Sequence, residues 1–193
     1  MLCDPGWWRF ETDGEDKAEL ILDGEPVVAR IMNTLQSISS TVVLNRNRPL
    51  TKGEISIPVI KDRLHDVGPL GGLHAVIHER EEEWFVLSAC DTPFVSPALY
   101  QYLLKQCHAG VSAVIPIYKG RMHPLSGVYH RSLSTVLDDY LRKGGRKISG
   151  FLEAVPAVFV KSFPTIEESQ LASHFFNMNT KADYEEALRI VEN

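Results

Sequence analysis

The stretch Trp84-Phe-Val-Leu-Ser-Ala-Cys-Asp-Thr-Pro93 constrains the fold of this chain most strongly. Its apolar part, Trp84–Ala89, has the length and β-propensity of a strand buried on both faces. Pro93 cannot continue a strand, and Ser96-Pro97 offers an N-cap followed by a proline at the first helical position. We therefore expect Asp91 at the carboxyl end of a central strand, where open α/β sheets bind ligands. A carboxylate there suits Mg²⁺ beside a phosphate-bearing ligand, or it only shapes the turn into the helix.

Strand-like and helix-like segments alternate along the chain. Strands are expected at Thr41–Leu44, Ile55–Ile60, Trp84–Ala89, Val111–Ile117 and Val155–Val160. Helices are expected to begin at Pro26, Gly68, Pro97 and Ser132, and after a capping box formed by Thr180 and Asp183. This alternation predicts an α/β fold with a doubly wound, mostly parallel sheet. With 193 residues, the chain is expected to form a single domain over 1–193, in which residues 1–14 are atypical.

Composition narrows the class of protein. Hydrophobic residues make up 44% of the chain and charged residues 23%, as in ordinary globular proteins. The net charge of −5 argues against nucleic acid as a partner, because a polyanion would need a broad basic surface. No apolar run approaches the roughly 20 residues of a membrane span. Three cysteines without paired spacing and an N-terminus without a secretory signal favour a cytoplasmic protein with reduced thiols.

Polar residues fall where strands end or helices begin. Lys17, Asn45, Asp62, Asp91 and the glycine-rich segment 68–72 share this property. In a parallel sheet such positions lie along one edge, so these residues can converge although they are far apart in the sequence. A glycine-rich turn into a helix also forms anion sites, since its free N–H groups and the helix dipole favour negative charge. Taken singly, each has a plainer explanation, namely a surface lysine, turn residues or close helix–sheet packing.

Several motifs, in order, resemble the molybdenum cofactor guanylyltransferase family. They are Asp16-Lys17, Leu22-Asp-Gly-Glu-Pro26, Val43-Leu-Asn-Arg-Asn47, Gly68-Pro-Leu-Gly-Gly-Leu73, Cys90-Asp-Thr-Pro93, His123-Pro124 and Phe176-Asn-Met-Asn-Thr180. The resemblance covers roughly residues 15–185. It implies a Rossmann-like fold of the nucleotide-diphospho-sugar-transferase type. It also implies transfer of GMP from GTP to molybdopterin, with Mg²⁺ required and pyrophosphate released. Molybdoenzymes or other proteins of molybdenum cofactor biosynthesis are the protein partners that it suggests.

The resemblance also assigns roles to single residues. Lys17 matches the family lysine that contacts the nucleotide phosphates, and Asp91 matches the residue that holds Mg²⁺ and touches GTP, so these two are the expected catalytic residues. Asn45 and Asp62 match residues on the base or ribose side of GTP. The expected molybdopterin-binding residues are His123, Asn177 and Asn179.

The chemistry of the implied reaction agrees with these assignments. A phosphate oxygen attacks the α-phosphorus of GTP, so charge neutralisation and in-line positioning matter more than a protein nucleophile. Lys17 and an ion on Asp91 would offset charge on the phosphates and on the departing pyrophosphate. Guanine presents two adjacent N–H donors that the carboxylate of Asp62 could accept, whereas adenine would leave it poorly paired. Backbone groups could read the base instead.

Residues 1–14 depart from the family pattern. The family opens with a strand, a Leu-x-Gly-Gly loop that cradles the triphosphate, and an Arg-Met-Gly-like stretch, whereas this chain has no Gly-Gly pair there. Either Trp7–Phe10 supplies a substitute strand, or the N-terminus is altered, or catalysis has been lost. Two hypotheses follow: an active guanylyltransferase, or a catalytically weak homologue that carries the pterin or acts as a chaperone. A nucleotidyltransferase with another base or acceptor is a further alternative on the same fold.

Overall fold

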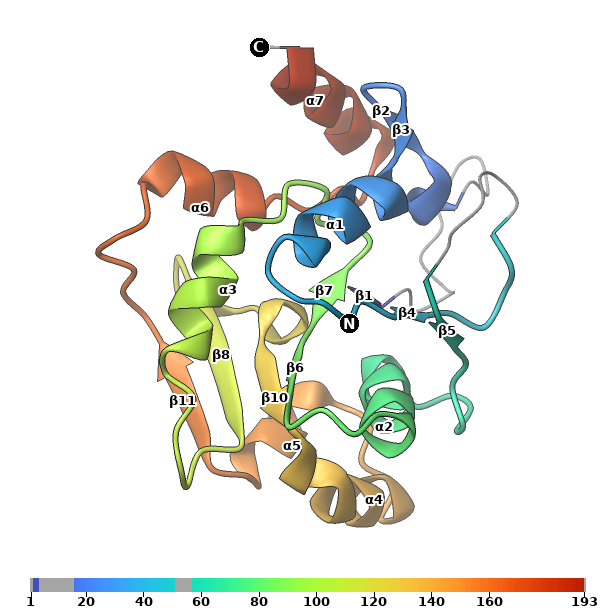
Figure 1. Ribbon diagram of the computed structural model, residues 1–193, viewed down its shortest axis with the longest axis vertical. Helices are drawn as coiled ribbons and strands as arrows, with labels where there is room; N and C mark the ends of the chain where they lie inside the picture. The colour runs from blue at the N-terminus through green and yellow to red at the C-terminus, as the bar shows by residue number, and fades with distance from the viewer. Residues whose placement is uncertain (1, 4–15, 51–56, 193) are drawn as a thin grey trace.

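A computed structural model describes residues 2–3, 16–50 and 57–192 (Figure 1). One half of its central sheet is parallel throughout, in the strand order β5-β4-β1-β7. These strands are short: β1 (Leu2–Cys3), β4 (Leu44–Asn45), β5 (Val59–Ile60) and β7 (Ser88–Ala89). The predicted strand at Thr41–Leu44 is therefore reduced to its last residue plus Asn45. Of the next predicted strand, Ile55–Ile60, residues 55 and 56 lie outside the described residues.

The other half of the sheet is mixed, in the order β11-β8-β10-β6 with β9 paired to β8. Its strands are β6 (Trp84–Val86), β8 (Ala113–Tyr118), β9 (Arg121–Met122), β10 (Val128–His130) and β11 (Ala157–Val160). Strand β10 runs antiparallel to both of its neighbours, while β11 and β8 are parallel. The prediction of an α/β fold with a mostly parallel sheet is confirmed, with β10 and β9, which is antiparallel to β8, as the exceptions.

Leu87 joins the two halves. The predicted strand Trp84–Ala89 is divided into β6 and β7, because the N–H of Leu87 donates to Gly127 O at 2.9 Å and the chain then pairs with β1 instead of β10. The side chain of Leu87 is fully buried. The predicted strand is therefore a single path through the centre of the molecule that changes partner halfway along.

Helices cover both faces of the sheet (Figure 1). On one face the apolar core includes residues of α1 (Val27–Gln36), α3 (Pro97–Leu104), α6 (Glu168–His174) and α7 (Lys181–Glu192). On the other face it includes residues of α2 (Pro69–Glu79), α4 (Ser134–Arg142) and α5 (Ile148–Glu153). Successive residues of β8 alternate between the two clusters, Val114 in the first and Ala113 and Ile115 in the second. Such alternation is what a strand between two helical layers requires.

Local signals predicted several helix ends correctly. Ser96 caps α3 by accepting a hydrogen bond from the N–H of Leu99, and Pro97 is its first residue. Asp183 Oδ2 accepts from the Thr180 N–H at 2.7 Å, and Thr180 Oγ1 accepts from the Asp183 N–H at 3.2 Å, which is the predicted capping box of α7. Helix α4 begins at Ser134, after a 3₁₀ turn at Arg131–Leu133, so the predicted start at Ser132 was two residues early.

Strand β1 occupies the centre of the sheet, between β4 and β7. The resemblance described above led us to expect a strand at the start of the chain. The alternative in which Trp7–Phe10 supplies that strand lies outside the described residues. Within the described part of the chain, none of the helices combines the length and apolar character needed to cross a membrane.

Candidate active site

The predicted site residues gather at the carboxyl edge of the parallel strands. The strand register places Asn45 opposite Ile60 and Cys3, and Cys3 opposite Ala89. Asp62 lies two residues beyond Ile60, and Asp91 two residues beyond Ala89. Both carboxylates therefore leave the sheet at the same edge, as predicted from the sequence.

Lys17 reaches this edge from the 3₁₀ turn η1 (Lys17–Glu19), which Asp16 caps by accepting from the Ala18 N–H at 3.0 Å. The lysine is only 3% exposed, and its Nζ donates to Asn179 Oδ1 at 2.9 Å. Burial lowers the pKa of Lys17, while the charges of Asp91 and Asp183 act in the opposite direction. A buried ammonium needs such partners, because desolvating an unpaired charge is costly.

Asp91 is the carboxylate at the centre of the site, with 9% of its surface exposed. Burial raises the pKa of Asp91, and the positive charges of Lys17 and Arg121 oppose the rise. Its backbone carbonyl accepts from the Met178 N–H at 2.8 Å. That bond fastens the loop between α6 and α7 to the end of β7, which brings Asn179 to Lys17.

Asp183 was predicted only as part of a helix cap, yet it also belongs to the site. Its Oδ2 accepts from the Asn179 N–H at 2.8 Å and from the Thr180 N–H. Burial alone would raise the pKa of Asp183. These backbone donors and the charge of Lys17 outweigh burial and hold the pKa of Asp183 below its ordinary value. The cap therefore fixes the Asn179 backbone and supplies negative charge near Lys17.

Asn45 and Asp62 are brought together, as predicted. Asn45 Nδ2 donates to Asp62 Oδ1 at 2.9 Å and to the Ile60 carbonyl at 3.1 Å. Asn47, which had no predicted role, donates from Nδ2 to Asp62 Oδ2 at 2.9 Å and accepts from the Asp62 N–H. Both carboxylate oxygens of Asp62 thus already accept a hydrogen bond. Each retains a second lone pair, so a ligand can still be recognised there.

The glycine-rich segment lies beside Asp62. Gly68 is the N-cap of α2 with φ 60° and ψ −149°, a conformation that is essentially restricted to glycine. A Cβ at Gly71 would lie 2.9 Å from Val67 Cγ2 and 3.3 Å from the carboxylate of Asp62. The absence of a side chain at Gly71 therefore lets the first turn of α2 approach this carboxylate closely.

Arg46 links the turn that carries Lys17 to the pair formed by Asn45 and Asp62. Sequence reasoning gave this arginine no role. The guanidinium is 4% exposed and forms ion pairs with Asp16 and Glu19, which flank Lys17. A buried, paired arginine at the end of β4 holds η1 beside Asn45. The available sequence signal was its place directly after Asn45 at a strand end.

His123 and Asn177 lie toward the other half of the sheet. The ring of His123 packs on Phe175 with 4.2 Å between centroids, and burial together with the charge of Arg121 lowers the pKa of His123 to about 4. The charge of Arg121 acts on the pKa of both His123 and Asp91. Asn177 is partly exposed on the loop that precedes Met178.

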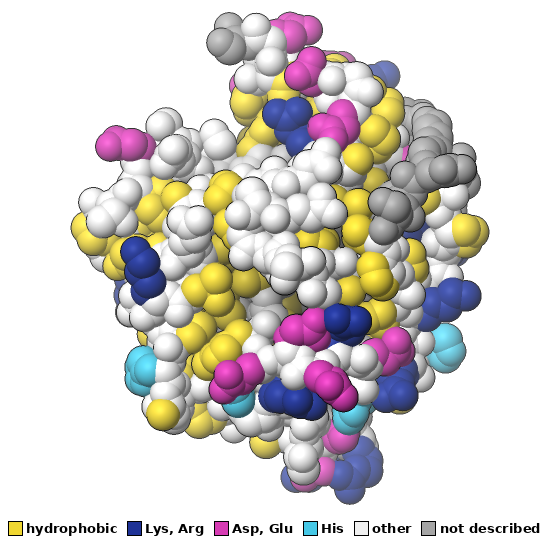
Figure 2. All heavy atoms as spheres, viewed as in Figure 1, with side chains coloured by type: hydrophobic (Ala, Val, Ile, Leu, Met, Phe, Trp, Pro, Cys, Tyr) yellow, Lys and Arg dark blue, Asp and Glu magenta, His cyan; other side chains and the backbone are white. Residues whose placement is uncertain are grey.

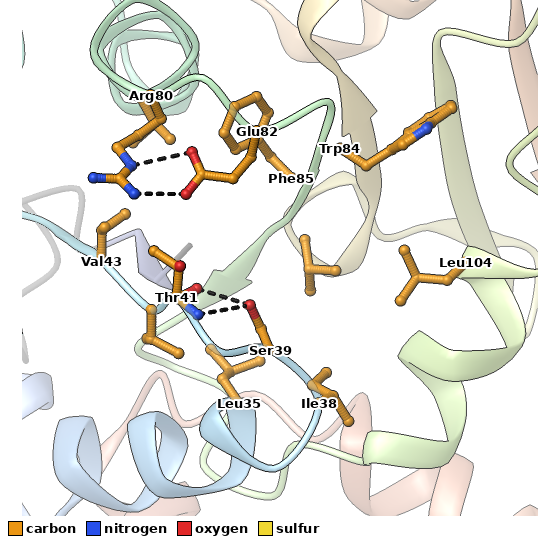
Figure 3. Close-up of a pocket in the computed structure, with 13 residues that line it drawn as sticks. Leu35, Ile38, Ser39, Thr41, Val43, Arg80, Glu82, Trp84, Phe85 and Leu104 are labelled. Atoms are coloured by element: carbon orange, nitrogen blue, oxygen red, sulfur yellow. Dashed lines mark hydrogen bonds and ion pairs between the residues drawn. The ribbon is translucent and has the colours of Figure 1, made fainter.

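A separate cavity of about 220 Å³ lies at the opposite, amino edge of the sheet (Figure 3). Its lining is mostly apolar and includes Leu35, Ile38, Val43, Phe85 and Leu104. Arg80 and Glu82, which form an ion pair, are charged residues of its lining. A triphosphate would find little positive charge there, because this arginine is already paired.

A mixed α/β sheet with a buried lysine and carboxylate at its carboxyl edge is the architecture of a nucleotide-handling enzyme. Comparison with known proteins agrees. The family model described as the MobA-like NTP transferase domain matches residues 9–157. The chain therefore belongs to this family and is a nucleotidyltransferase.

Individual relatives support the assignment. A molybdenum cofactor guanylyltransferase of Yersinia pestis (strain Pestoides F) is 37% identical over 176 residues, which cover 88% of this chain and 85% of that protein. The structure of molybdopterin-guanine dinucleotide biosynthesis protein A from Archaeoglobus fulgidus superposes with a TM-score of 0.80 at 26% identity, over 99% of this chain and 97% of that one. A 2-C-methyl-D-erythritol 4-phosphate cytidylyltransferase from Thermus thermophilus, at 13% identity, 100% and 98% coverage and a TM-score of 0.73, shares the fold alone. The resemblance inferred from the sequence motifs is confirmed.

Proposed function

We propose that this protein transfers GMP from GTP to molybdopterin, forming the guanine dinucleotide cofactor and releasing pyrophosphate. The observation that carries the proposal is the buried Lys17, hydrogen-bonded to Asn179 and close to the charges of Asp91 and Asp183. The names of the relatives supply the base and the acceptor. The whole chain, 1–193, is proposed to act as one nucleotidyltransferase domain.

In the proposed reaction, one P–O bond forms at the α-phosphorus of GTP and another breaks. An oxygen of the terminal phosphate of molybdopterin attacks the α-phosphorus of GTP, and the bond from that phosphorus to the oxygen bridging to the β-phosphate breaks. The β- and γ-phosphates leave as pyrophosphate with that electron pair. Lys17 offers a fixed positive charge for oxygens that become more negative along this path, and burial strengthens the interaction by excluding water.

The residues present fit a magnesium ion. Asp91 is a hard oxygen ligand at a strand end, and because burial raises its pKa, this carboxylate would gain from a nearby cation. Mg²⁺ commonly takes one or two carboxylates and fills its other positions with water and phosphate oxygens. When bound, it would neutralise phosphate charge. Asp91 would hold it.

Asp62 is proposed to face the base or the ribose. Two asparagines, Asn45 and Asn47, orient its carboxylate, and neither of these side chains carries a positive charge. An oriented acceptor favours guanine, whose N1–H and exocyclic amine are both donors, over adenine. Asn45 thus acts as a positioning residue for Asp62 in addition to its predicted place in the nucleotide site.

His123, Asn177 and Asn179 are proposed to bind the pterin substrate. His123 has a pKa of about 4, so it is a neutral imidazole near pH 7 and can donate or accept a hydrogen bond without adding charge. Asn179 bonds to Lys17 and therefore lies where the acceptor phosphate would meet the GTP phosphates. The two substrates would then lie on either side of Asp91.

Turnover tests the proposal. Purified protein is incubated with molybdopterin, Mg²⁺ and either GTP, CTP or ATP, and pyrophosphate and the dinucleotide product are measured. Formation of the dinucleotide product with GTP, but not with CTP or ATP, supports the proposal. Turnover with CTP or ATP instead would assign a different base.

The departure at residues 1–14 favours one competing function, a pterin carrier or chaperone with little catalysis. Binding of molybdopterin without pyrophosphate release would support it. The molybdoenzymes or biosynthetic proteins that would receive the product, and the cytoplasmic location, remain predictions from the sequence.

A further inference from the structure

A second cluster of possible metal ligands lies between α2 and α4. His74 and His78 are four residues apart on α2, so both side chains lie on one face of the helix. The Nε2 atom of each lies 2.9 Å from the same oxygen, Oδ1 of Asp138 on α4. All three ligand atoms lie within 4.8 Å of one another.

The cluster is separate from the nucleotide site. It lies along α2 beyond the first turn that approaches Asp62, and it joins the two helices on one face of the sheet. Figure 2 shows acidic, basic and histidine side chains interspersed over the region where Figure 1 places α4 and the end of α2. Nothing in the transfer reaction proposed above uses these residues.

The chemistry of the donor set points to a borderline transition metal. Two histidines four residues apart on a helix can bind one Zn²⁺, and a carboxylate is a common third ligand that leaves a fourth position for water. Each imidazole can offer a lone pair on Nε2 to a metal when its Nδ1 carries the proton. The positive charge of Arg63 acts against a bound cation. Arg63 Nε lies 4.0 Å from Glu79 Oε1, so the charge of this carboxylate partly offsets it.

The two distances from the histidines to Asp138 need little adjustment, and the two Nε2 atoms, within 4.8 Å of each other, would approach one another around the ion. Ligand atoms at about 2.0–2.1 Å from a tetrahedral Zn²⁺ are roughly 3.3 Å apart, so the two 2.9 Å contacts would widen by a few tenths of an ångström. The Asp138 side chain is 41% exposed and can move by that amount, while His74 stays fixed in the core. The His74 Nδ1 atom has no partner among the described residues, and a missing outer acceptor weakens a site.

We propose that His74, His78 and Asp138 form a divalent metal site of zinc type that ties α2 to α4. Its affinity is expected to be on the order of micromolar, because one ligand is exposed and the outer shell is incomplete. The same contacts without a metal form a hydrogen-bonded triad, in which both imidazoles donate to one carboxylate. A metal site takes up a divalent ion, whereas a hydrogen-bonded triad does not, so a measurement of metal uptake distinguishes the two.

Zinc titration of the chelator-treated full chain tests this inference, with a chromogenic chelator as competitor. One equivalent of Zn²⁺ should bind, and Co²⁺ should give the visible absorption of a four-coordinate site. His78→Ala and Asp138→Asn should each weaken binding at least about tenfold. His108→Ala, which alters an exposed histidine elsewhere, should bind as the unmodified chain does.

Two further measurements separate this site from others. Uptake should persist in Asp91→Asn, which removes the proposed magnesium ligand, so the result does not depend on guanylyl transfer. Circular dichroism establishes that each variant is folded. Equal uptake by the unmodified chain, His78→Ala and Asp138→Asn would show adventitious binding elsewhere, and no uptake at all would leave only the hydrogen-bonded triad; either result overturns the proposal.

Discussion

Lys17 Nζ and Asn179 Oδ1 lie 2.9 Å apart although 162 positions separate the two residues. This contact joins the N-terminal turn η1 to the loop before α7, with Asp91 beside it. The loop is itself held by the bond from the Met178 N–H to the Asp91 carbonyl. The two ends of the described chain thus meet at the edge of the sheet where the nucleotide is proposed to bind.

Replacing Lys17 should weaken the binding of GTP more than the binding of molybdopterin. Lys17→Ala removes a charge-assisted interaction, worth about 1.5–3 kcal/mol, so the Kd for GTP should rise roughly 10- to 100-fold. The Kd for molybdopterin should change much less. Calorimetric titration of both ligands measures the difference, and Lys143→Ala, at an exposed lysine directly after α4, is the control. Equal losses for the two ligands would argue against a phosphate contact.

Asp91→Asn should nearly abolish turnover while the protein stays folded. Losing the charge that holds the metal should cost several kcal/mol, or about 1,000-fold in kcat. Because burial raises the pKa of Asp91, protons should compete with Mg²⁺ above the ordinary titration range of an aspartate. As the pH falls, the Mg²⁺ concentration for half-maximal rate should therefore begin to increase at a pH above the ordinary pKa of an aspartate, about 3.9.

The control for this variant is Asp139→Asn, a partly exposed position on α4. Rates close to those of the unmodified chain in Asp91→Asn would remove Asp91 from the mechanism. A Mg²⁺ requirement that does not vary with pH would contradict the role of its raised pKa.

The sequence predicted the fold largely through local signals. The cap at Ser96, the capping box at Thr180 and the alternation of strands and helices depend on neighbouring residues, and each is seen in the structure. The helices α5 and α6 were missed, since six and seven residues are too few for a clear 3.6-residue period. The break at Leu87 was missed because it depends on the change of strand partner.

The site was predicted in part, from the order of strands and helices. Asn45, Asp62 and Asp91 follow strand ends, so their convergence could be inferred from topology. Arg46 and Asn47 were not given roles, because their partners Asp16 and Asp62 are 30 and 15 positions away. Pairings at that separation depend on how the elements pack, which a local pattern does not contain.

His174 should make the protein sensitive to acid. Its Nδ1 accepts from the Ser96 N–H, and burial lowers the pKa of His174 from the ordinary 6.5 to about 3. Between these values the unfolded chain binds a proton that the native state excludes, so stability falls as the pH decreases through this window. The expected slope from this residue is about 1.4 kcal/mol per pH unit.

Urea unfolding at several pH values checks this slope. His174→Gln keeps an acceptor for the Ser96 N–H and removes the titrating group, so its acid limb should be shallower by that amount. His108→Gln should follow the unmodified chain. If His174→Gln lost stability toward acid as steeply as the unmodified chain, the buried neutral histidine would not be the cause.

The departure at residues 1–14 leads to a prediction about the gene. Tryptophan has the single codon TGG, so Trp7-Trp8 is encoded by TGGTGG, and reading one nucleotide later gives two glycine codons whichever arginine codon follows. The same displaced reading permits leucine in place of Pro5 and Arg-Met-Gly in place of Thr12-Asp13-Gly14. These match the Leu-x-Gly-Gly loop and the Arg-Met-Gly stretch of the family, in their order.

We therefore expect a shift of reading frame across this segment. Resequencing the gene and measuring the mass of the N-terminal peptide of the natural protein will test it. A chain with the displaced reading restored should bind GTP more tightly, since backbone N–H groups of a glycine loop bind phosphate. If the N-terminal peptide of the natural protein contains Trp7-Trp8, residues 1–14 are translated as they stand in this sequence and the expectation is wrong.

The central claim is that one edge of the sheet holds the nucleotide, and a crystal structure of the protein with GTP and Mg²⁺ tests it most directly. The account predicts the triphosphate between Lys17 and Asp91, with the base toward Asp62. Nucleotide density elsewhere, such as in the apolar cavity at the opposite edge, would contradict it.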